Sequence, residues 1–309
     1  MHVNKILNDV TVLFTGYNIK PFAILAIESF LLHNPQLRKN VVFFDDESTD
    51  GTREELEARG IKIITWLPQI KKKFDEFEKA TLGTYHVISC LPQRCSFINY
   101  CAAMQIKTRY LFISDGDIVY FNNFFLHCVD KFAQSNCLIA GSTASIPIDI
   151  DMSVIEYLEV LDKGGFLIKT EKGFERVKIY PNQMLLDIKE LKNRGIMFDN
   201  INAIHPYDDT GHDFYRQLIQ HQIPHIEVID FDEIHGVNNW FMHLYNLASL
   251  RRINNINYKN NMVNTVRNNF SDTRVFDVCD RLGINLDEIC KDFINYIIVG
   301  NPEKTVTFP

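Results

Sequence analysis

The sequence predicts an α/β fold with a mostly parallel sheet flanked by helices and a C-terminal helical extension. Apolar runs rich in β-branched or aromatic residues indicate strands, and stretches with apolar residues at helical spacing alternate with them. A strand–helix–strand–helix–strand order at short spacing is typical of a parallel sheet covered by helices. The predicted strands are 10–15, 40–44 and 61–66, and the predicted helices between them are 21–33 and 52–59.

Local signals support each of these first elements. The run VTVLFT at 10–15 is bounded by Gly16, as expected for a short buried strand. Pro21 suits the first turn of the helix that follows, because its fixed φ is already helical. Gly60 closes the second helix, and the strand 61–66 begins directly after it.

The rest of the chain continues the alternation less regularly. Between 68 and 91 the sequence is charged and is predicted to be irregular, and 96–106 is predicted to be a helix behind the sheet. From about Trp240 the sequence is predicted to be helical and asparagine-rich, with an amphipathic stretch at 275–298. The other predicted elements are strands at 110–114, 183–187 and 226–229 and a helix at 212–221.

Composition limits the classes of function. The 309 residues carry 32 Lys and Arg against 39 Asp and Glu, a net charge of -7 that gives no support for nucleic-acid binding. Seven cysteines, an odd number without a C-x-x-C pair, indicate reduced thiols in a cytosolic protein. The N-terminus lacks a signal-peptide pattern, and we find no apolar run long enough to span a bilayer. We therefore expect a soluble cytoplasmic protein, and a peripheral membrane contact stays open.

Polar residues gather where the predicted parallel strands end. Asp115 and Asp117 follow the strand 110–114, separated by one glycine. Thr15, Asp45 and Asp46 stand at the ends of the first two strands. Ligands of open parallel sheets bind beyond the carboxyl ends of the strands, so these residues are expected to form one site. Two carboxylates at one strand end can share Mg²⁺ or Mn²⁺, which relieves their repulsion; the simple alternative is a turn with two solvated acids.

Three motifs in order resemble a known family. FTGYN at 14–18, FFDDESTDGT at 43–52 and ISDGD at 113–117 resemble GT-A fold glycosyltransferases, most nearly glycosyltransferase family 2 and related bacterial nucleotide-sugar-dependent enzymes. The resemblance covers about the first 125 residues well and continues more weakly to about residue 240. It implies a Rossmann-like GT-A domain with a nucleotide-sugar-binding half at 1–125, an acceptor and catalytic half at 126–244, and a helical extension at 245–309.

The resemblance also implies roles for residues of the donor site. Thr15 and Tyr17 match the loop that lies against the nucleotide. Asp46 matches the acid that accepts a hydrogen bond from the base, with Asp45 beside it. Arg94 matches the basic residue that precedes the D-x-D strand.

The same resemblance assigns the metal ligands. Asp117 matches the more direct metal ligand, and Asp115 matches the acid that reaches the ribose or the metal through water. His235, in FDEIHG, matches a C-terminal histidine that would complete the shell of a Mn²⁺ or Mg²⁺ ion. His243 is a weaker candidate for the same position.

The segment YDDTGHDFYRQL at 207–218 resembles the acidic motif of the family. An inverting enzyme needs a carboxylate to take the proton from the acceptor hydroxyl. Asp209 is the first candidate for this base and Asp213 is the second. The alternative is that these acids only stabilise the N-terminus of the helix that begins near residue 212.

The sequence thus predicts a metal-dependent glycosyltransferase that moves a sugar from a nucleotide diphosphate, a UDP-sugar, to a hydroxyl acceptor with inversion, in surface-glycan synthesis. A retaining enzyme, a transferase acting on a nucleic-acid base, and a non-catalytic nucleotide-sugar binder remain alternatives. Nucleotidyl transfer is disfavoured, because the loop TGYNIKPF has only one glycine and one lysine. A homodimer formed through the C-terminal extension also stays open.

Overall fold

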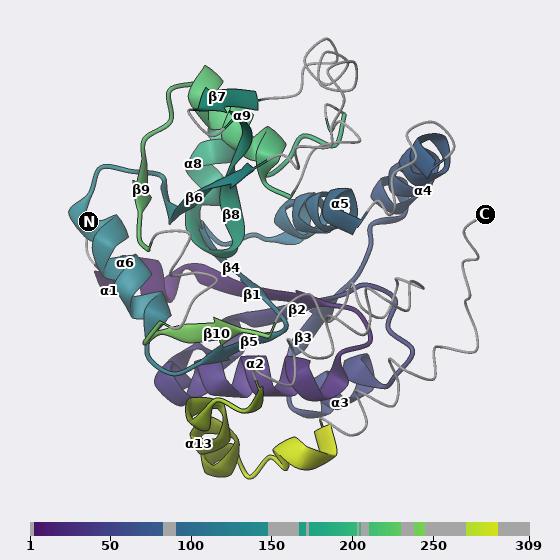
Figure 1. The fold of residues 1–309 in the computed structure, drawn as a ribbon, viewed down its shortest axis with the longest axis vertical. Helices are drawn as coiled ribbons and strands as arrows, with labels where there is room; N and C mark the ends of the chain where they lie inside the picture. Colours follow the sequence, from purple (N-terminus) through teal and green to yellow (C-terminus); the bar gives the residue numbers. More distant parts are fainter. Residues whose placement is uncertain are drawn as a thin grey trace. The chain divides into compact units, whose positions relative to one another are not determined.

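The computed structural model describes residues 3–82, 91–147, 167–170, 173–202, 204, 210–229, 238–244 and 270–289 (Figure 1). Its helices and strands follow the order α1 (Val3–Asn8), β1 (Val10–Gly16), α2 (Lys20–His33), the 3-10 helix η1 (Pro35–Asn40), β2 (Val41–Asp45), α3 (Thr52–Ala58), β3 (Lys62–Ile64), α4 (Pro68–Leu82), α5 (Leu91–Gln105), β4 (Tyr110–Asp115), β5 (Ile118–Tyr120), α6 (Phe124–Gln134), β6 (Ile139–Pro147), β7 (Leu167–Thr170), β8 (Gly173–Asp187), α8 (Ile188–Asn193), α9 (His212–Gln220), β9 (His225–Glu227), β10 (Phe241–His243) and α13 (Thr273–Leu282).

The predicted α/β fold is confirmed. The main sheet has the order β3-β2-β1-β4-β8-β6-β9, with β7 paired to β8, and it is mostly parallel. Strand β8 runs antiparallel to β4, in a register that pairs Tyr110 with Asp187 and Ser114 with Gln183. It is also antiparallel to β6, whereas β6 and β9 are parallel. Strands β5 and β10 form a separate two-stranded sheet.

The chain divides into two compact units that interleave along the sequence. The first unit comprises Met1–Leu13, Ile64–Ser114 and Phe125–Glu233, and the second comprises Phe14–Ile63, Asp115–Phe124 and Ile234–Pro309. Strands β1 and β4 each contribute residues to both units. The predicted halves 1–125 and 126–244 and the extension 245–309 concern function, and they stay a prediction.

In the first unit, helices pack on the sheet through aromatic side chains. Helix α6 places Phe125 against Phe112 of β4, with ring centroids 5.1 Å apart. Helix α4 places Phe74 against Phe97 of α5 at 5.3 Å. Each of these four rings is at most 1% exposed, so the contacts exclude water and form a close-packed core.

In the second unit, helix α2 packs along β5 (Figure 1). Phe30 of α2 meets Phe14 at 5.7 Å and Tyr120 at 5.4 Å between ring centroids. Phe241 of β10 lies 6.2 Å from Tyr120 and 4.9 Å from Phe124. This chain of rings holds the small β5–β10 sheet against α2, which matters because two short strands alone are marginally stable in water.

Two predicted elements were wrong. The stretch 68–91, predicted to be irregular, contains helix α4, whose buried Ile70 and Phe74 lie four residues apart on one face. Residues Phe241–His243, predicted to be helical, form strand β10. The partner strand decided the structure of residues 241–243, because a three-residue segment has weak local preferences.

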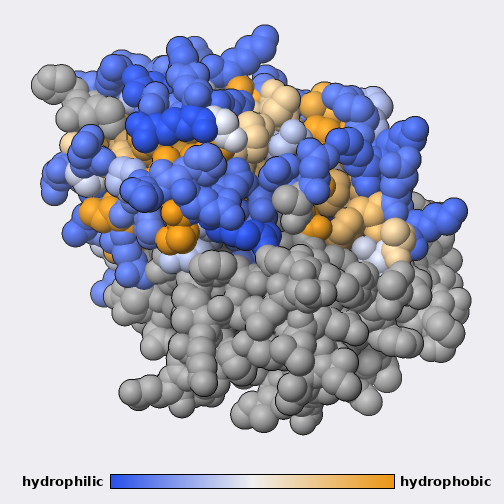
Figure 2. Space-filling model, turned by 90° about the horizontal axis from the view of Figure 1, so that it is seen from above, coloured by the Kyte–Doolittle hydropathy of each residue, from blue (hydrophilic) through white to orange (hydrophobic). Residues whose placement is uncertain are grey.

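The described surface is largely polar. On the face shown in Figure 2, the coloured residues are mainly hydrophilic, and apolar residues lie in small groups among them. The large exposed apolar side chains occur on four different helices and are Met104, Leu126, Ile219 and Phe276. Within the described part of the chain, no helix has the length and apolar character needed to cross a membrane.

We expect the replacement Asp187→Ala to be strongly destabilising. The Asp187 side chain is 2% exposed, and its Oδ2 accepts hydrogen bonds from Nε and Nη2 of Arg109 at 2.9 and 2.8 Å. Its Oδ1 caps α8 by accepting from the backbone N–H of Glu190 at 3.1 Å. Removing a buried charge partner and a cap together should lower the free energy of unfolding by about 3 kcal/mol in urea titrations.

The matched control is Arg194→Ala, which removes a solvent-exposed ion pair with Glu190 on the same helix. It should change the free energy of unfolding by less than about 0.5 kcal/mol. Equal effects of the two replacements would contradict the role assigned to Asp187.

Candidate functional site

Two carboxylates and an imidazole converge at the end of β4. Strand β4 ends at Asp115, Gly116 follows, and Asp117 precedes β5. One ligand atom from each of Asp115, Asp117 and His243 lies within 4.8 Å of the others. Nε2 of His243 is 3.1 Å from Oδ1 of Asp117 and 3.5 Å from Oδ2 of Asp115.

The pairing of β5 with β10 brings the histidine to the acids. The register sets His243 opposite Ile118, the residue directly after Asp117. The backbone N–H of Leu244 then donates to the carbonyl oxygen of Asp117 at 2.8 Å. Side chains alternate between the faces of a strand, so this register fixes the side on which His243 projects.

The electrostatics of the cluster suit a divalent cation. The side chains of His243 and Asp117 are 6% and 8% exposed, while that of Asp115 is 33% exposed. Burial lowers the pKa of His243, but the charge and hydrogen bond of Asp117 and the charge of Asp115 outweigh it and raise that pKa. Two carboxylate oxygens and an imidazole nitrogen are an acceptable donor set for Mn²⁺, and the oxygens also suit Mg²⁺.

The histidine in this cluster is the weaker of the two sequence candidates. His235, the first candidate, lies outside the described residues. His243 follows the run Phe241–Met242, and the predicted helix at this point hid its position at the end of a strand. A strand assignment would have placed it at a strand end, as with the two aspartates.

The backbones of three strand ends meet around the cluster. The N–H of Gly116 donates to the carbonyl oxygen of Thr15 at 2.9 Å, and the N–H of Asp46 donates to that of Gly16 at 3.0 Å. A Cβ atom on Gly116 would lie 2.5 Å from the Thr15 oxygen, closer than real Cβ contacts allow. Glycine is therefore required between the two aspartates, because the chain passes so close to the end of β1.

The loop after β2 is fastened by Asn18, which the sequence analysis did not single out. Asn18 is fully buried and has a φ of 50°, a left-handed conformation that asparagine tolerates better than most residues. Its N–H donates to Oγ of Ser48 at 2.9 Å, and its Oδ1 accepts from the N–H of Thr49 at 2.6 Å. The loop is thus held against the start of α2.

A second set of hydrogen bonds holds the same loop through the side chain of Asp50. Its Oδ2 accepts from the N–H of Lys20 at 3.1 Å, and its Oδ1 accepts from the N–H of Thr52 at 3.0 Å. Asp50 therefore joins the first turns of α2 and α3. Together, the hydrogen bonds of Asn18 and Asp50 fix the backbone conformation of the loop DDESTDG.

The predicted nucleotide contacts lie at this fastened loop. Asp45 and Asp46 are each 3% exposed, and Thr15 and Tyr17 are partly exposed. Oδ1 of Asp45 accepts from the N–H of Ser48 at 3.2 Å, so this carboxylate shapes the turn. Burial raises the pKa of Asp45, and the hydrogen bonds from Ser48 oppose that rise. The contacts of these four residues with a donor stay a prediction.

Arg94 belongs to the first unit, on α5. Its guanidinium carbon lies 4.9 Å from the ring centroid of Phe74 and 5.5 Å from that of Trp66. These cation–π contacts hold the side chain against the aromatic face. Its predicted role in donor binding stays a prediction.

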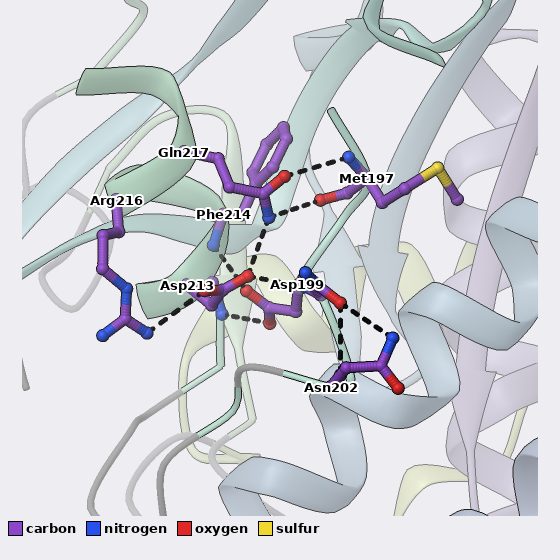
Figure 3. Close-up of polar contacts among 9 residues, drawn as sticks. Met197, Asp199, Asn202, Asp213, Phe214, Arg216 and Gln217 are labelled. Atoms are coloured by element: carbon purple, nitrogen blue, oxygen red, sulfur yellow. Dashed lines mark hydrogen bonds and ion pairs between the residues drawn. The ribbon is translucent and has the colours of Figure 1, made fainter. Parts of the chain in front are cut away.

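The acidic motif is described from Thr210 onward, so Asp209 lies outside the described residues. Asp213 stands in the first turn of α9 and is 4% exposed. Its Oδ2 accepts from the N–H of Asn200 at 2.6 Å and from Nε2 of Gln217 at 2.7 Å, as Figure 3 shows. Its Oδ1 lies 3.2 Å from Nη2 of Arg216. Both oxygens of Asp213 are therefore engaged within the protein.

Asp199 makes the reciprocal contacts and was missed from the sequence. It is fully buried, and its two oxygens accept from the N–H groups of Gly211 and Phe214, each at 2.8 Å. Asp199 thus satisfies the start of α9, while Asp213 on that helix binds the backbone next to Asp199 (Figure 3). A single aspartate after an apolar run carries no signal for such a long-range cap.

Several solved structures are similar to this chain. No family model and no curated protein matches its sequence. The chain is similar to glucosyl-3-phosphoglycerate synthase from Mycobacterium tuberculosis, with a TM-score of 0.42 and 11% identity over 92% of this chain and 86% of that one. For the complex of the same synthase with phosphoglyceric acid, the TM-score is 0.33 and the identity 11% over 62% of each chain.

The chain is also similar to core-mannan synthase A from Aspergillus fumigatus in its Mn/GDP form. The TM-score is 0.38 and the identity 12%, over 60% of each chain. The chain therefore spans less than two thirds of the length of this synthase and of the phosphoglyceric acid complex. We infer no activity from similarity at these TM-scores, and the function proposed below rests on the residues of the site.

The buried Asp199 predicts a pH dependence of stability. Burial, opposed by hydrogen bonds from Ser96, Gly211 and Phe214, raises its pKa from 3.8 to about 6. Between these values the folded protein holds more protons at Asp199 than the unfolded chain, so stability falls as the pH rises. From pH 4 to pH 7, Asp199 should remove up to about 3 kcal/mol from the free energy of unfolding.

Urea titrations at several pH values test this. The decrease in the free energy of unfolding with rising pH should be absent in Asp199→Asn. It should be retained in Asp75→Asn, which changes an exposed aspartate of α4. Parallel curves for Asp199→Asn and the unchanged protein would contradict the prediction.

Proposed function

We propose that this protein is a metal-dependent glycosyltransferase that moves a sugar from a nucleotide diphosphate donor, a UDP-sugar, to a hydroxyl acceptor. The observation that carries the proposal is the cluster of Asp115, Asp117 and His243 within 4.8 Å. It lies in the same compact unit as the motifs FTGYN and FFDDESTDGT, next to backbone contacts that join the strand ends. Those motifs are the ones that resemble the nucleotide-sugar-binding half of GT-A enzymes.

The proposed role of the metal follows from the chemistry of the donor. When the glycosidic bond breaks, negative charge builds on the bridging oxygen of the departing diphosphate. A divalent ion, when bound, would supply positive charge that stabilises this oxygen and would offset the repulsion between the donor and the two aspartates. Asp117 and His243 would hold the ion from the buried side, and the more exposed Asp115 would face the ribose or the ion.

The proposed donor site relies on the loop that Asn18 and Asp50 fasten. Asp46, Thr15 and Tyr17 would contact the nucleoside there. A loop whose backbone is already fixed loses little conformational freedom when the ligand binds, so more of the contact energy contributes to affinity.

For the catalytic base we propose Asp209, with inversion at the anomeric carbon. Asp213 is the weaker candidate, since its two oxygens already accept bonds from Asn200, Gln217 and Arg216. A carboxylate held in this way stabilises the helix start, and proton transfer requires a group that can reach the acceptor hydroxyl. The acceptor that we propose is a glycan.

The variants Asp117→Ala and His243→Ala should both lose Mn²⁺-dependent turnover of the donor. Each replacement removes one of the two buried ligands of the proposed centre, whose side chains are 8% and 6% exposed. Hydrolysis of a panel of nucleotide sugars with and without Mn²⁺ provides the measurement. The matched control is His221→Ala, an exposed histidine at the end of α9, and near-normal activity of Asp117→Ala would refute the metal assignment.

Replacing the proposed base should slow transfer without weakening donor binding. Asp209→Asn should lower kcat by roughly 10²–10⁴ while leaving the Kd of the donor unchanged. Asp213→Asn should mainly lower stability, because it disrupts the hydrogen bonds that hold the helix start.

The same assay with an NMR readout of the product tests inversion. A product with the configuration of the donor would show that the enzyme is retaining and would refute a base role for either aspartate. Loss of kcat in Asp213→Asn, with normal kcat in Asp209→Asn, would move the base to Asp213.

A further inference from the structure

Arg274 joins the C-terminal helix α13 to the small sheet that carries His243. It stands in the first turn of α13 and forms a bidentate ion pair with the N-cap residue Asp272, with Nε–Oδ1 and Nη2–Oδ2 distances of 2.9 and 2.7 Å. Its Nη1 donates to the backbone carbonyl of Asn238, and its guanidinium carbon lies 4.4 Å from the ring centroid of Phe121. One side chain therefore contacts the segment after β5 and the segment before β10.

The point that Arg274 contacts is the start of β10. Oδ1 of Asn238 accepts from the N–H groups of Trp240 and Phe241 at 2.8 and 2.9 Å. The carbonyl of Trp240 accepts from the N–H groups of Phe121 and Asn122 at 2.8 and 3.1 Å. These bonds set where β10 begins relative to the end of β5.

The other end of the same strand pair is the metal centre. Three residue pairs, from Phe241 with Tyr120 to His243 with Ile118, lie between the Asn238 turn and the cluster. Arg274 contacts the end of the strand pair that lies away from the ligands, so it does not itself bind the ion. A register shift of one residue would project His243 to the opposite face, away from Asp117.

We propose that Arg274 is a positioning residue for the metal centre, which it serves by holding β10 in the register that sets His243 beside Asp117. A pair of three-residue strands is too short to fix its own register, so contacts from outside the pair must fix it. Arg274 supplies such contacts to the segment after β5 and to the turn before β10, from a helix that belongs to the predicted C-terminal extension. This inference rests on the proposed metal-dependent function and adds that the extension positions a ligand of the metal centre.

The test measures Mn²⁺ affinity of the full chain without donor, by calorimetry and by EPR of free Mn²⁺. Arg274→Met keeps the length and apolar part of the side chain but removes its charge and donors. It should weaken Mn²⁺ binding about tenfold, the lower range for residues that orient metal ligands. The control Arg281→Met, an exposed arginine in the last turn of the same helix, should bind Mn²⁺ as the unchanged protein does.

A double-mutant comparison separates positioning from general destabilisation. If Arg274 acts through His243, Arg274→Met should cause no further loss of Mn²⁺ affinity in a chain that already carries His243→Ala. Arg274→Lys, which keeps the charge and one donor, should have an affinity between those of the unchanged protein and Arg274→Met, and it replaces Arg274→Met if that variant does not fold.

The outcomes distinguish the inference from the function on which it rests. If Arg274→Met binds Mn²⁺ within twofold of the unchanged protein, the positioning role alone is overturned. The same conclusion follows if Arg274→Met lowers Mn²⁺ affinity equally in chains with His243 and in chains that carry His243→Ala. Absence of Mn²⁺ binding by the unchanged protein overturns the proposed metal centre and the inference together.

Discussion

The antiparallel pairing of β5 with β10 is the constraint on which the cluster of Asp115, Asp117 and His243 depends. Asp115 and Asp117 are neighbours in the sequence, but His243 is 126 residues from Asp117 and reaches it only through this register. The pair is short, so its position is set by what surrounds it. Phe241 packs against Tyr120 and Phe124, while hydrogen bonds at Asn238 and Leu244 fix the two ends of β10. The position of His243 is thus supported by a hydrophobic core and by backbone hydrogen bonds together.

Three polar side chains of the second unit accept hydrogen bonds from backbone N–H groups of nearby segments. Asn18 binds the loop after β2, Asp50 joins the starts of α2 and α3, and Asp45 holds its own turn. Buried polar groups without partners would cost free energy, so these contacts also specify the loop conformation.

The first unit uses buried carboxylates for a different purpose. Asp199 and Asp213 each accept backbone N–H groups from the segment that carries the other, and Gln217 adds two bonds to the backbone of Met197. The start of α9 is therefore held rigidly. Both oxygens of Asp213 are engaged in these contacts, so its carboxylate stabilises the start of α9.

The sequence by itself determined the alternation of strands and helices and the placement of Thr15, Asp46, Asp115 and Asp117 at strand ends, and it predicted a divalent metal there. These follow from local periodicity and from residue types at short spacing, which do not depend on distant partners. Only the tertiary structure decided that residues 241–243 form a strand, that His243 joins the acids, and that Asp199 caps α9. Each of these depends on a contact between segments far apart in the chain, and local preferences of three or four residues are too weak to specify such a contact.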